Sequence, residues 1–266
     1  MTIKSPIINI MTRAAYKAGN KLIKDFREVE NLQVSKKGIG DFVTSADLNS
    51  EKTIIKELGK AISDIEIISE ETNSKILKND EKKWIIDPLD GTLNFLHGLP
   101  HFAISIALMY KQEIVSGVIY DPIKDELFWS EKGMGSFVNN TRIRVSSRND
   151  LKNSLVSTGI PWKGMEQNHK NYLKILENVM KNCSGVRRYG AAALDLAYVA
   201  AGRYDAFWEF GLKIWDIAAG SLLVKEAGGF VGNLSNNDQE NFLYTGNVFA
   251  CNNSLNDDLQ DKIFLL

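Results

Sequence analysis

The sequence has few of the residues on which several classes of protein depend. It holds two cysteines, Cys183 and Cys251, and three histidines in 266 residues. Two cysteines are too few for a disulfide framework or a thiolate zinc site, and they are typical of a reducing compartment. His97, His101 and His169 are too scattered along the chain to indicate a three-histidine metal site.

Long apolar runs and an excess of one charge are also missing. No stretch approaches the ~18 to 20 apolar residues of a membrane span, and the first six residues lack the apolar stretch of a signal peptide. Basic and acidic residues nearly cancel, 32 against 33, which argues against a basic nucleic-acid-binding module. We therefore expect a cytoplasmic protein that binds no membrane and contacts no nucleic acid directly.

The remaining composition is that of a folded globular protein. Apolar residues make up 44% and charged residues 24% of the chain, close to the averages of soluble domains. At about 150 residues per domain, the length fits one large domain or two fused halves. The polar segment 146–150 is the candidate boundary. It separates an N-terminal α+β half, residues 1–146, from a C-terminal α/β half, residues 147–266.

Apolar periodicity predicts the order of helices and strands. Ser5 followed by Pro6 is typical of a helix start, and helical spacing continues to Phe26. Largely antiparallel strands are expected between residues 101 and 145, and alternating strands and helices beyond residue 150 predict an α/β layer. The segment 36–41, which contains two glycines and two lysines, predicts a mobile loop before a second helix at 46–59.

Two carboxylates follow a buried strand in the segment 84–92. Pro88 fixes the turn between Asp87 and Asp90, and Gly91 frees the backbone just beyond, so both acids can point into one cleft. An isolated Asp-x-x-Asp pair is equally typical of a turn and a helix cap. The pair alone leaves both interpretations open.

Further acids end one predicted strand and open one predicted helix. Glu70 and Glu71 follow the strand 65–69, and Asp216 follows Trp215. Each acid taken singly is more typical of the surface or of an N-cap. Several carboxylates in one cavity, however, repel each other and take up protons unless a cation neutralises them. Oxygen ligands without nearby histidine or cysteine favour Mg²⁺ over Zn²⁺.

A candidate phosphate site follows the second aspartate. Gly91 and Thr92 lie at a predicted helix start, where unpaired backbone N–H groups face outward and can hold an anion. The Thr92 hydroxyl either relays a proton from an attacking water or caps the next helix. The residue type leaves both roles open.

Four segments, 41–47, 69–71, 87–95 and 215–229, combine these features in one order. The combination of Asp-Pro-x-Asp-Gly-Thr with a distal Trp-Asp-x-Ala-Ala-Gly is far more specific than either motif. In this order the segments resemble the inositol monophosphatase family, part of a group of Mg²⁺-dependent, Li⁺-sensitive phosphatases. The resemblance runs from the first helix to about Cys251, and it implies a five-layered α-β-α-β-α sandwich and a homodimer.

The resemblance also implies a role for each site residue. Metal ligands are implied at Glu70, Asp87, Asp90, Asp216 and the carbonyl of Leu89. The dyad of Thr92 and Asp47 matches the pair that positions a water, which Glu70 helps to activate. Substrate contacts are implied at Asp90, Ala192, Glu209 and Asp216.

Some positions depart from the family's pattern or lie in less specific segments. Leu93 stands where many relatives carry a second threonine, and Ile214 stands where similar bacterial sequences often carry proline. Lys36 lies in the segment that corresponds to the family's flexible metal loop. The run from Arg187 to Asp195 resembles bacterial members in particular, although Arg188 is equally typical of a polar strand edge.

The implied activity is hydrolysis of a phosphate monoester by direct in-line attack of a metal-activated water. The segment 94–97 resembles inositol monophosphatases, and a carboxylate at Glu209 suits a neutral polyol and repels a second phosphate. Myo-inositol 1-phosphate is therefore the expected substrate. The alternatives are a histidinol-phosphate, fructose bisphosphate or 3′-phosphoadenosine phosphatase, and a protein-binding role in bacterial transcription or RNA processing through a protein partner.

Overall fold

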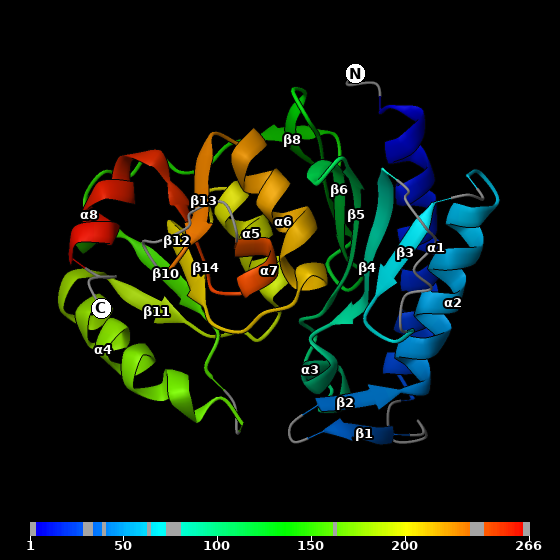
Figure 1. The fold of residues 1–266 in the computed structure, drawn as a ribbon, viewed down its shortest axis with the longest axis horizontal. Coiled ribbons are helices and arrows are strands. Elements are labelled where there is room, and N and C mark those ends of the chain that lie inside the picture. Colours follow the sequence, from blue (N-terminus) through cyan, green and yellow to red (C-terminus); the bar gives the residue numbers. More distant parts are fainter. Residues whose placement is uncertain are drawn as a thin grey trace.

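A computed structural model describes residues 4–28, 34–38, 41–62, 65–72, 81–161, 164–234 and 242–262. Over these residues, helices and two large sheets stack in five layers (Figure 1). The order of the layers is α-β-α-β-α, as the sequence predicts. Apolar clusters fill the spaces between the layers, so the stacking is held by burial of apolar side chains.

The helices are α1 Pro6–Phe26, α2 Ser45–Gly59, α3 Thr92–Leu96, α4 Glu166–Asn182, α5 Ala192–Ala200, α6 Ile214–Glu226, α7 Phe242–Thr245 and α8 Asn256–Lys262. The strands are β1 Val34–Gly38, β2 Asp41–Thr44, β3 Glu66–Ser69, β4 Lys82–Asp90, β5 Ala103–Tyr110, β6 Glu113–Asp121, β7 Glu126–Glu131, β8 Gly135–Val138, β9 Thr141–Ile143, β10 Leu155–Thr158, β11 Gly185–Arg187, β12 Ala206–Glu209, β13 Gly229–Asn233 and β14 Val248–Asn252.

Helix α1 begins where the sequence predicts. The Ser5 side chain accepts a hydrogen bond from the Ile8 backbone N at 3.2 Å, and Pro6 occupies the first turn. A capped first turn with proline satisfies donors that the helix itself leaves unpaired. The buried stripe of α1, which includes Met11 and Leu22, packs with α2 against one face of the larger sheet. These two helices form the outer layer on the right of Figure 1.

The larger sheet has seven strands in the order β3-β4-β5-β6-β7-β8-β9. Only the β3–β4 pair is parallel, so the prediction of a largely antiparallel sheet is confirmed. Strand β4 is buried on both faces: Trp84 and Ile86 join the cluster under α1 and α2, while Ile85 joins the cluster under α5 and α6. The alternation follows from the two-residue period of a strand.

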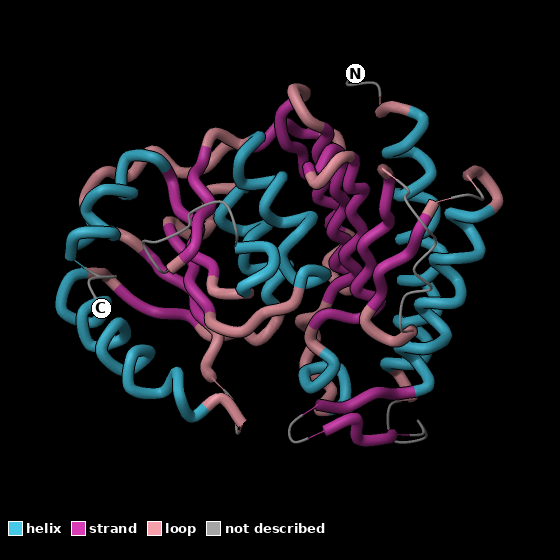
Figure 2. The backbone as a smooth tube through the Cα atoms, in the orientation of Figure 1, coloured by secondary structure: helices cyan, strands magenta, loops and turns pink. Residues whose placement is uncertain are grey.

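The second sheet has five strands in the order β11-β10-β12-β14-β13. Strand β10 runs parallel to β11 and β12, and β14 runs antiparallel to β12 and β13. Helices α5 and α6 fill the space between the two sheets (Figure 2). Helices α4 and α8 cover the outer face through an apolar cluster that includes Tyr172, Ile175 and Leu259.

One prediction about the backbone is wrong over its described part. The segment expected to be a loop, 36–41, contributes to two strands, because Val34 pairs with Thr44 and Lys36 with Phe42 in an antiparallel hairpin. Backbone hydrogen bonds between the two segments replace those that a loop would make with water. Residues 39 and 40 lie outside the described residues. The place of Lys36 in a metal loop stays a prediction.

Two further expectations concern the chain as a whole. The seven-stranded sheet ends at Ile143 and the five-stranded sheet begins at Leu155, but α5 and α6 pack on both sheets, and the division at residue 146 stays a prediction. Among the described helices, none combines the length and the apolar character needed to cross a membrane.

Candidate active site

Strands β3 and β4 place Glu70 and Asp87 at one edge of the larger sheet. The strands are parallel, with Ser69 beside Ile86, so both end at the same edge. Glu70 follows β3 directly, and its backbone N donates to the Ile86 carbonyl at 3.3 Å. Asp87 is the next residue along β4. Parallel pairing therefore places Glu70 and Asp87 side by side in the backbone, although they are distant in sequence.

A backbone irregularity in β4 presents the second aspartate. The register with β5 shifts between Asp87 and Asp90. The Leu89 backbone N donates to Asp87 Oδ1 at 2.9 Å, and the Ser50 hydroxyl of α2 donates to the Pro88 carbonyl at 2.7 Å. These bonds hold the turn from both sides. The turn is therefore rigid, which is the condition for a defined position of both carboxylates.

Asp90 joins the two halves of the site. Its Oδ2 accepts a hydrogen bond from the Ala193 backbone N in the first turn of α5 at 2.8 Å. Asp90 is 9% exposed and Asp87 is 1% exposed. Acidic residues are seldom buried to this extent without a partner of opposite charge.

Asp216 lies in the first turn of α6. Its Oδ2 accepts a hydrogen bond from the Lys213 backbone N at 2.7 Å, as a capping acid does. The Ser105 hydroxyl of β5 donates to the Trp215 carbonyl at 3.2 Å and ties this turn to the larger sheet. Asp216 is therefore not the N-cap, which is Lys213, but the third helical residue of a capping box, and this bond fixes where the carboxylate lies.

The pKa values show that these acids share one environment. Burial, followed by the charges of Glu70, Asp90 and Asp216, raises the pKa of Asp87 well above its ordinary value. Burial, followed by the charge of Asp216, does the same to the pKa of Asp90. Burial raises the pKa of Asp216 to about 6. The structure thus brings Glu70, Asp87, Asp90 and Asp216 together, and their repulsion requires protons or a cation.

The donor set decides which cation fits. All the donors are carboxylate or carbonyl oxygens, which suit a hard ion such as Mg²⁺. Within the described ranges, no group of three or more histidine, cysteine, aspartate or glutamate side chains is already arranged so that it could hold a metal ion. The assignment of Glu70, Asp87, Leu89, Asp90 and Asp216 as ligands therefore stays a prediction, supported by burial and mutual repulsion.

Thr92 and Asp47 meet beside the acids. The Thr92 Oγ1 lies 3.0 Å from Asp47 Oδ1 and 3.0 Å from the Leu89 carbonyl oxygen, so its single proton has two acceptors. Asp47 is fully buried, which raises its pKa, and its Oδ2 accepts hydrogen bonds from the backbone N and hydroxyl of Thr44. The dyad expected from the sequence is thus formed, with Asp47 held by the cap of α2.

Gly91, the residue before Thr92, shows that Thr92 is not the N-cap of α3. The N-cap of α3 is Gly91, in a left-handed conformation with φ of 91°, and Thr92 is the first helical residue. A Cβ at Gly91 would approach the His101 carbonyl oxygen to 3.1 Å. Glycine tolerates both constraints. Thr92 is therefore not the helix cap, and its hydroxyl is committed to Asp47 and Leu89. Phosphate contacts at Gly91 and Thr92 stay a prediction.

Glu209 is the last residue of β12, in the five-stranded sheet. Burial first, and the charge of Asp216 next, raise the pKa of Glu209 to about 8, while the Arg188 guanidinium opposes the shift. Gly159 leaves room for this side chain, because a Cβ there would overlap the Glu209 carboxyl. Ala192 begins α5, one residue before the N–H that binds Asp90. Asp90, Ala192, Glu209 and Asp216 thus come from four segments to one region.

Sequence reasoning gave no role in the site to three residues that lie in or around it. Ser50 holds the Asp87–Asp90 turn, and the Asn94 amide donates to the carbonyls of His101 and Tyr189 at 2.8 and 2.7 Å. Asp195 is 1% exposed, and burial, Glu209 and Asp90 raise its pKa well above the ordinary value. A single acid in the otherwise apolar run 191–200 was the available signal for Asp195.

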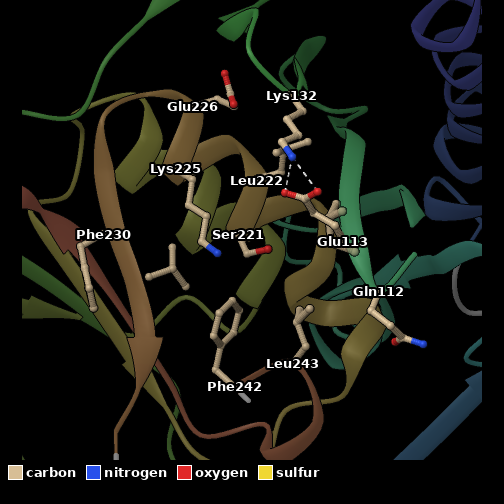
Figure 3. A pocket seen from close by; sticks show the side chains of 12 residues that line it. Gln112, Glu113, Lys132, Ser221, Leu222, Lys225, Glu226, Phe230, Phe242 and Leu243 are labelled. Atoms are coloured by element: carbon tan, nitrogen blue, oxygen red, sulfur yellow. Dashed lines mark hydrogen bonds and ion pairs between the residues drawn. The ribbon is translucent and has the colours of Figure 1, made fainter. Parts of the chain in front are cut away.

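A pocket of about 460 Å³ lies apart from these acids, at the far end of α6 (Figure 3). Lys225 points into it beside the Phe242 ring, 5.2 Å from the ring centroid. Lys132 and Glu113 form an ion pair of 2.5 Å at its rim. The pocket contains none of the predicted site residues. It is therefore a separate feature of the surface.

Comparisons with known proteins agree with the geometry. The sequence model described as the inositol monophosphatase family matches residues 3–264. An inositol-1-monophosphatase of Mesorhizobium japonicum is 51% identical over 249 residues, which cover 94% of this chain and 92% of the relative. A protein of Escherichia coli K12 named Nus factor SuhB is 44% identical over 247 residues, 93% of this chain and 91% of that protein.

The solved structures give the same result for the fold. The crystal structure of extragenic suppressor protein suhB from Bartonella henselae matches with a TM-score of 0.93 and 48% identity, over 97% of this chain and 98% of that one. The match spans both sheets and the helices between them. The chain belongs to the inositol monophosphatase family.

Proposed function

We propose that the protein is a phosphatase that hydrolyses myo-inositol 1-phosphate, or a closely similar polyol phosphate, to inositol and phosphate. The observation that carries the proposal is the burial of Asp87 and Asp90 of β4, on which the charges of Glu70 and Asp216 act, beside the Thr92–Asp47 pair. Two relatives that are 51% and 49% identical to this chain are named inositol-1-monophosphatase, which supports the same substrate.

The chain's own residues have complementary parts in this reaction. Thr92, held by Asp47 and the Leu89 carbonyl, orients a water for in-line attack on phosphorus, and Glu70 accepts a proton from that water. The ester P–O bond breaks as the new P–O bond forms, and the departing alkoxide takes up a proton. Bound Mg²⁺, held by the four carboxylates and Leu89, would supply charge neutralisation. Positioning and electrostatics then provide most of the rate.

Glu209 selects the substrate in this proposal. A carboxylate accepts hydrogen bonds from the hydroxyls of a neutral polyol, and it repels a second phosphate group. Its place at the end of β12, beside Gly159, and the effect of its charge on the pKa of Asp90 support this role. Inositol 1-phosphate therefore fits better than a bisphosphate.

Phosphate release from a panel of phosphomonoesters tests the proposal. We expect Mg²⁺-dependent release from inositol 1-phosphate, and loss of that activity in Asp90→Asn with the fold retained. Asp25→Asn, which changes an acid on α1, is the control and should keep full activity. A hundredfold preference for a nucleotide such as 3′-phosphoadenosine 5′-phosphate, or full activity of Asp90→Asn, would contradict it.

Three finer properties belong to the same proposal. Mg²⁺ is the expected ion, Li⁺ is expected to inhibit, and the protein is expected to act as a homodimer in the cytoplasm. Activity assays with each divalent ion and with LiCl test the first two. Light scattering tests the third, because a monomeric mass at micromolar concentration would contradict it.

Relatives named Nus factor SuhB favour a second role beside catalysis. The role is binding to a protein partner in transcription or RNA processing. Replacing Asp216 by Asn separates the two roles, because it removes a site acid while leaving most of the surface intact. Rescue of a deletion strain by this variant would support the binding role, and failure to rescue would favour the enzyme alone.

A further inference from the structure

Asp195 is a buried acid to which the reaction above gives no part. It lies in the first turn of α5, two residues after the Ala193 N–H that binds Asp90. It is 1% exposed. Among the described residues its Oδ1 has no hydrogen-bond partner. A buried carboxyl oxygen without a partner costs free energy, so a position like this needs an explanation.

The groups around Asp195 belong to the substrate wall. Glu209 and Asp90 both raise its pKa, after burial, and Arg188 opposes them. The Ser157 hydroxyl of β10 also opposes the rise through a hydrogen-bond interaction with the carboxyl, although Ser157 Oγ meets no partner with full hydrogen-bond geometry within the described part of the chain. Ser157 is 0% exposed. Two buried polar groups without a well-formed hydrogen bond thus lie near Glu209.

The fold explains why these groups meet. Strand β10 pairs in parallel with β12, with Ser157 beside Phe207, so the strand ends at Gly159 and Glu209 lie together. Helix α5 packs against this sheet from inside the molecule. Asp195 lies on the helix that covers this face, and Ser157 lies two residues before Gly159 on β10, so both are near Glu209 on the side of the sheet that faces α5.

We propose that Asp195 and Ser157 form the inner wall of the substrate pocket and hold Glu209 in the orientation that accepts hydrogen bonds from substrate hydroxyl groups. Asp195 is then a positioning residue for polyol specificity. The proposal rests on the proposed function. It adds that selectivity for hydroxyl-bearing phosphates depends on a residue that acts through Glu209.

Discrimination between two substrates tests the proposal. Inositol 1-phosphate presents ring hydroxyls to Glu209, whereas 4-nitrophenyl phosphate has none. We expect Asp195→Asn to lower the ratio of kcat/KM for the two substrates by about three- to tenfold, the size of one lost hydrogen bond, mainly through a higher KM for inositol 1-phosphate. Ser157→Ala should act in the same direction with a smaller change, and it remains informative if Asp195→Asn folds poorly.

A double-mutant cycle with Glu209→Gln shows whether Asp195 acts through Glu209. If it does, the double variant loses little more discrimination than Glu209→Gln alone. Asp205→Asn is the matched control: this acid is 0% exposed, precedes β12 and binds the Leu155 N–H at 2.7 Å, so it should change stability but not discrimination.

Additive losses in the cycle, or an unchanged ratio in both Asp195→Asn and Ser157→Ala, would overturn the proposal. These results differ from failure of the proposed function, in which the unmodified protein itself would release no phosphate from inositol 1-phosphate.

Discussion

Asp47 serves structure and chemistry through different oxygens. Oδ2 accepts from Thr44 and completes the cap of α2, while Oδ1 lies 3.0 Å from the Thr92 hydroxyl. The cap therefore fixes the orientation of the oxygen that faces Thr92. An arrangement of this kind preorganises the hydroxyl without any movement on substrate binding.

Removing the Thr92 hydroxyl tests its catalytic part. We expect Thr92→Ala to lower kcat by about 100-fold or more, because a positioned proton-transfer group contributes at least that factor. The melting temperature should change little, since Asp47 keeps its bonds to Thr44. Thr53→Ala is the control, because Thr53 is a half-buried threonine of α2 whose hydroxyl donates to the Asn49 carbonyl. Equal activity of Thr92→Ala and the unmodified protein would contradict the assignment.

Residues with strong local signals were predictable, and those defined by distant contacts were not. Ser5 and Pro6 predict the start of α1, and Pro88 predicts the turn between Asp87 and Asp90. Each of these signals acts within a few residues of the chain. The role of Asp195 depends on Ser157 and Glu209, which only the fold brings near. No periodicity within α5 distinguishes it from a structural acid.

At the scale of elements, close packing of α5 and α6 places Asp216 and Asp90 in one region. Gly220 of α6 lies against α5, and a Cβ at this position would be 2.5 Å from the Leu196 Cβ. A contact this short forces the two helices apart. The separation between the segments that carry Asp216 and Ala193 depends on this interface.

Gly220→Ala should therefore destabilise the protein. We expect a loss of about 1 to 3 kcal/mol in the free energy of unfolding, measured with urea, together with lower activity. Gly59→Ala is the matched control: no atom lies within 4 Å of its Cβ position, and alanine favours the end of α2. That change should raise stability by up to about 1 kcal/mol. A neutral Gly220→Ala would show that the helices separate without cost.

Elements also differ in how far the sequence predicts them. Strands β5 and β6 and helix α4 follow from their apolar patterns. Strand β13 was not expected, because Gly229 and Gly232 interrupt the β-branched pattern, and its place depends on pairing with β14. The segment 36–41, which contributes to the β1–β2 hairpin, was expected as a loop because its pattern is short and polar, but its described residues pair as strands.

For the whole molecule, the acids of the site link stability to pH. The pKa of Glu209 is raised to about 8 and that of Asp216 to about 6, whereas unfolded carboxyls titrate near ~4. The folded state therefore holds these protons more tightly. Their contribution to stability is complete below pH ~4 and is lost as the pH rises through 6 and 8.

We expect the melting temperature in EDTA to fall by several degrees between pH 5 and pH 8.5, and added Mg²⁺ to reduce the fall by neutralising the acids. Glu209→Gln should flatten the profile because it removes the group that titrates near pH 8. Glu57, with a pKa lowered to about 2 by Lys60 and Lys17, titrates below this window and does not interfere. A rising profile in EDTA would contradict the linkage.

Calorimetric titration with Mg²⁺ at pH 7.5 tests most directly whether the gathered acids bind a cation. The account predicts saturable binding at millimolar Mg²⁺ or below for the unmodified protein, and binding weakened at least tenfold in Asp90→Asn and in Asp216→Asn, with Asp25→Asn unchanged. No uptake by the unmodified protein, or equal uptake by all four proteins, would contradict it.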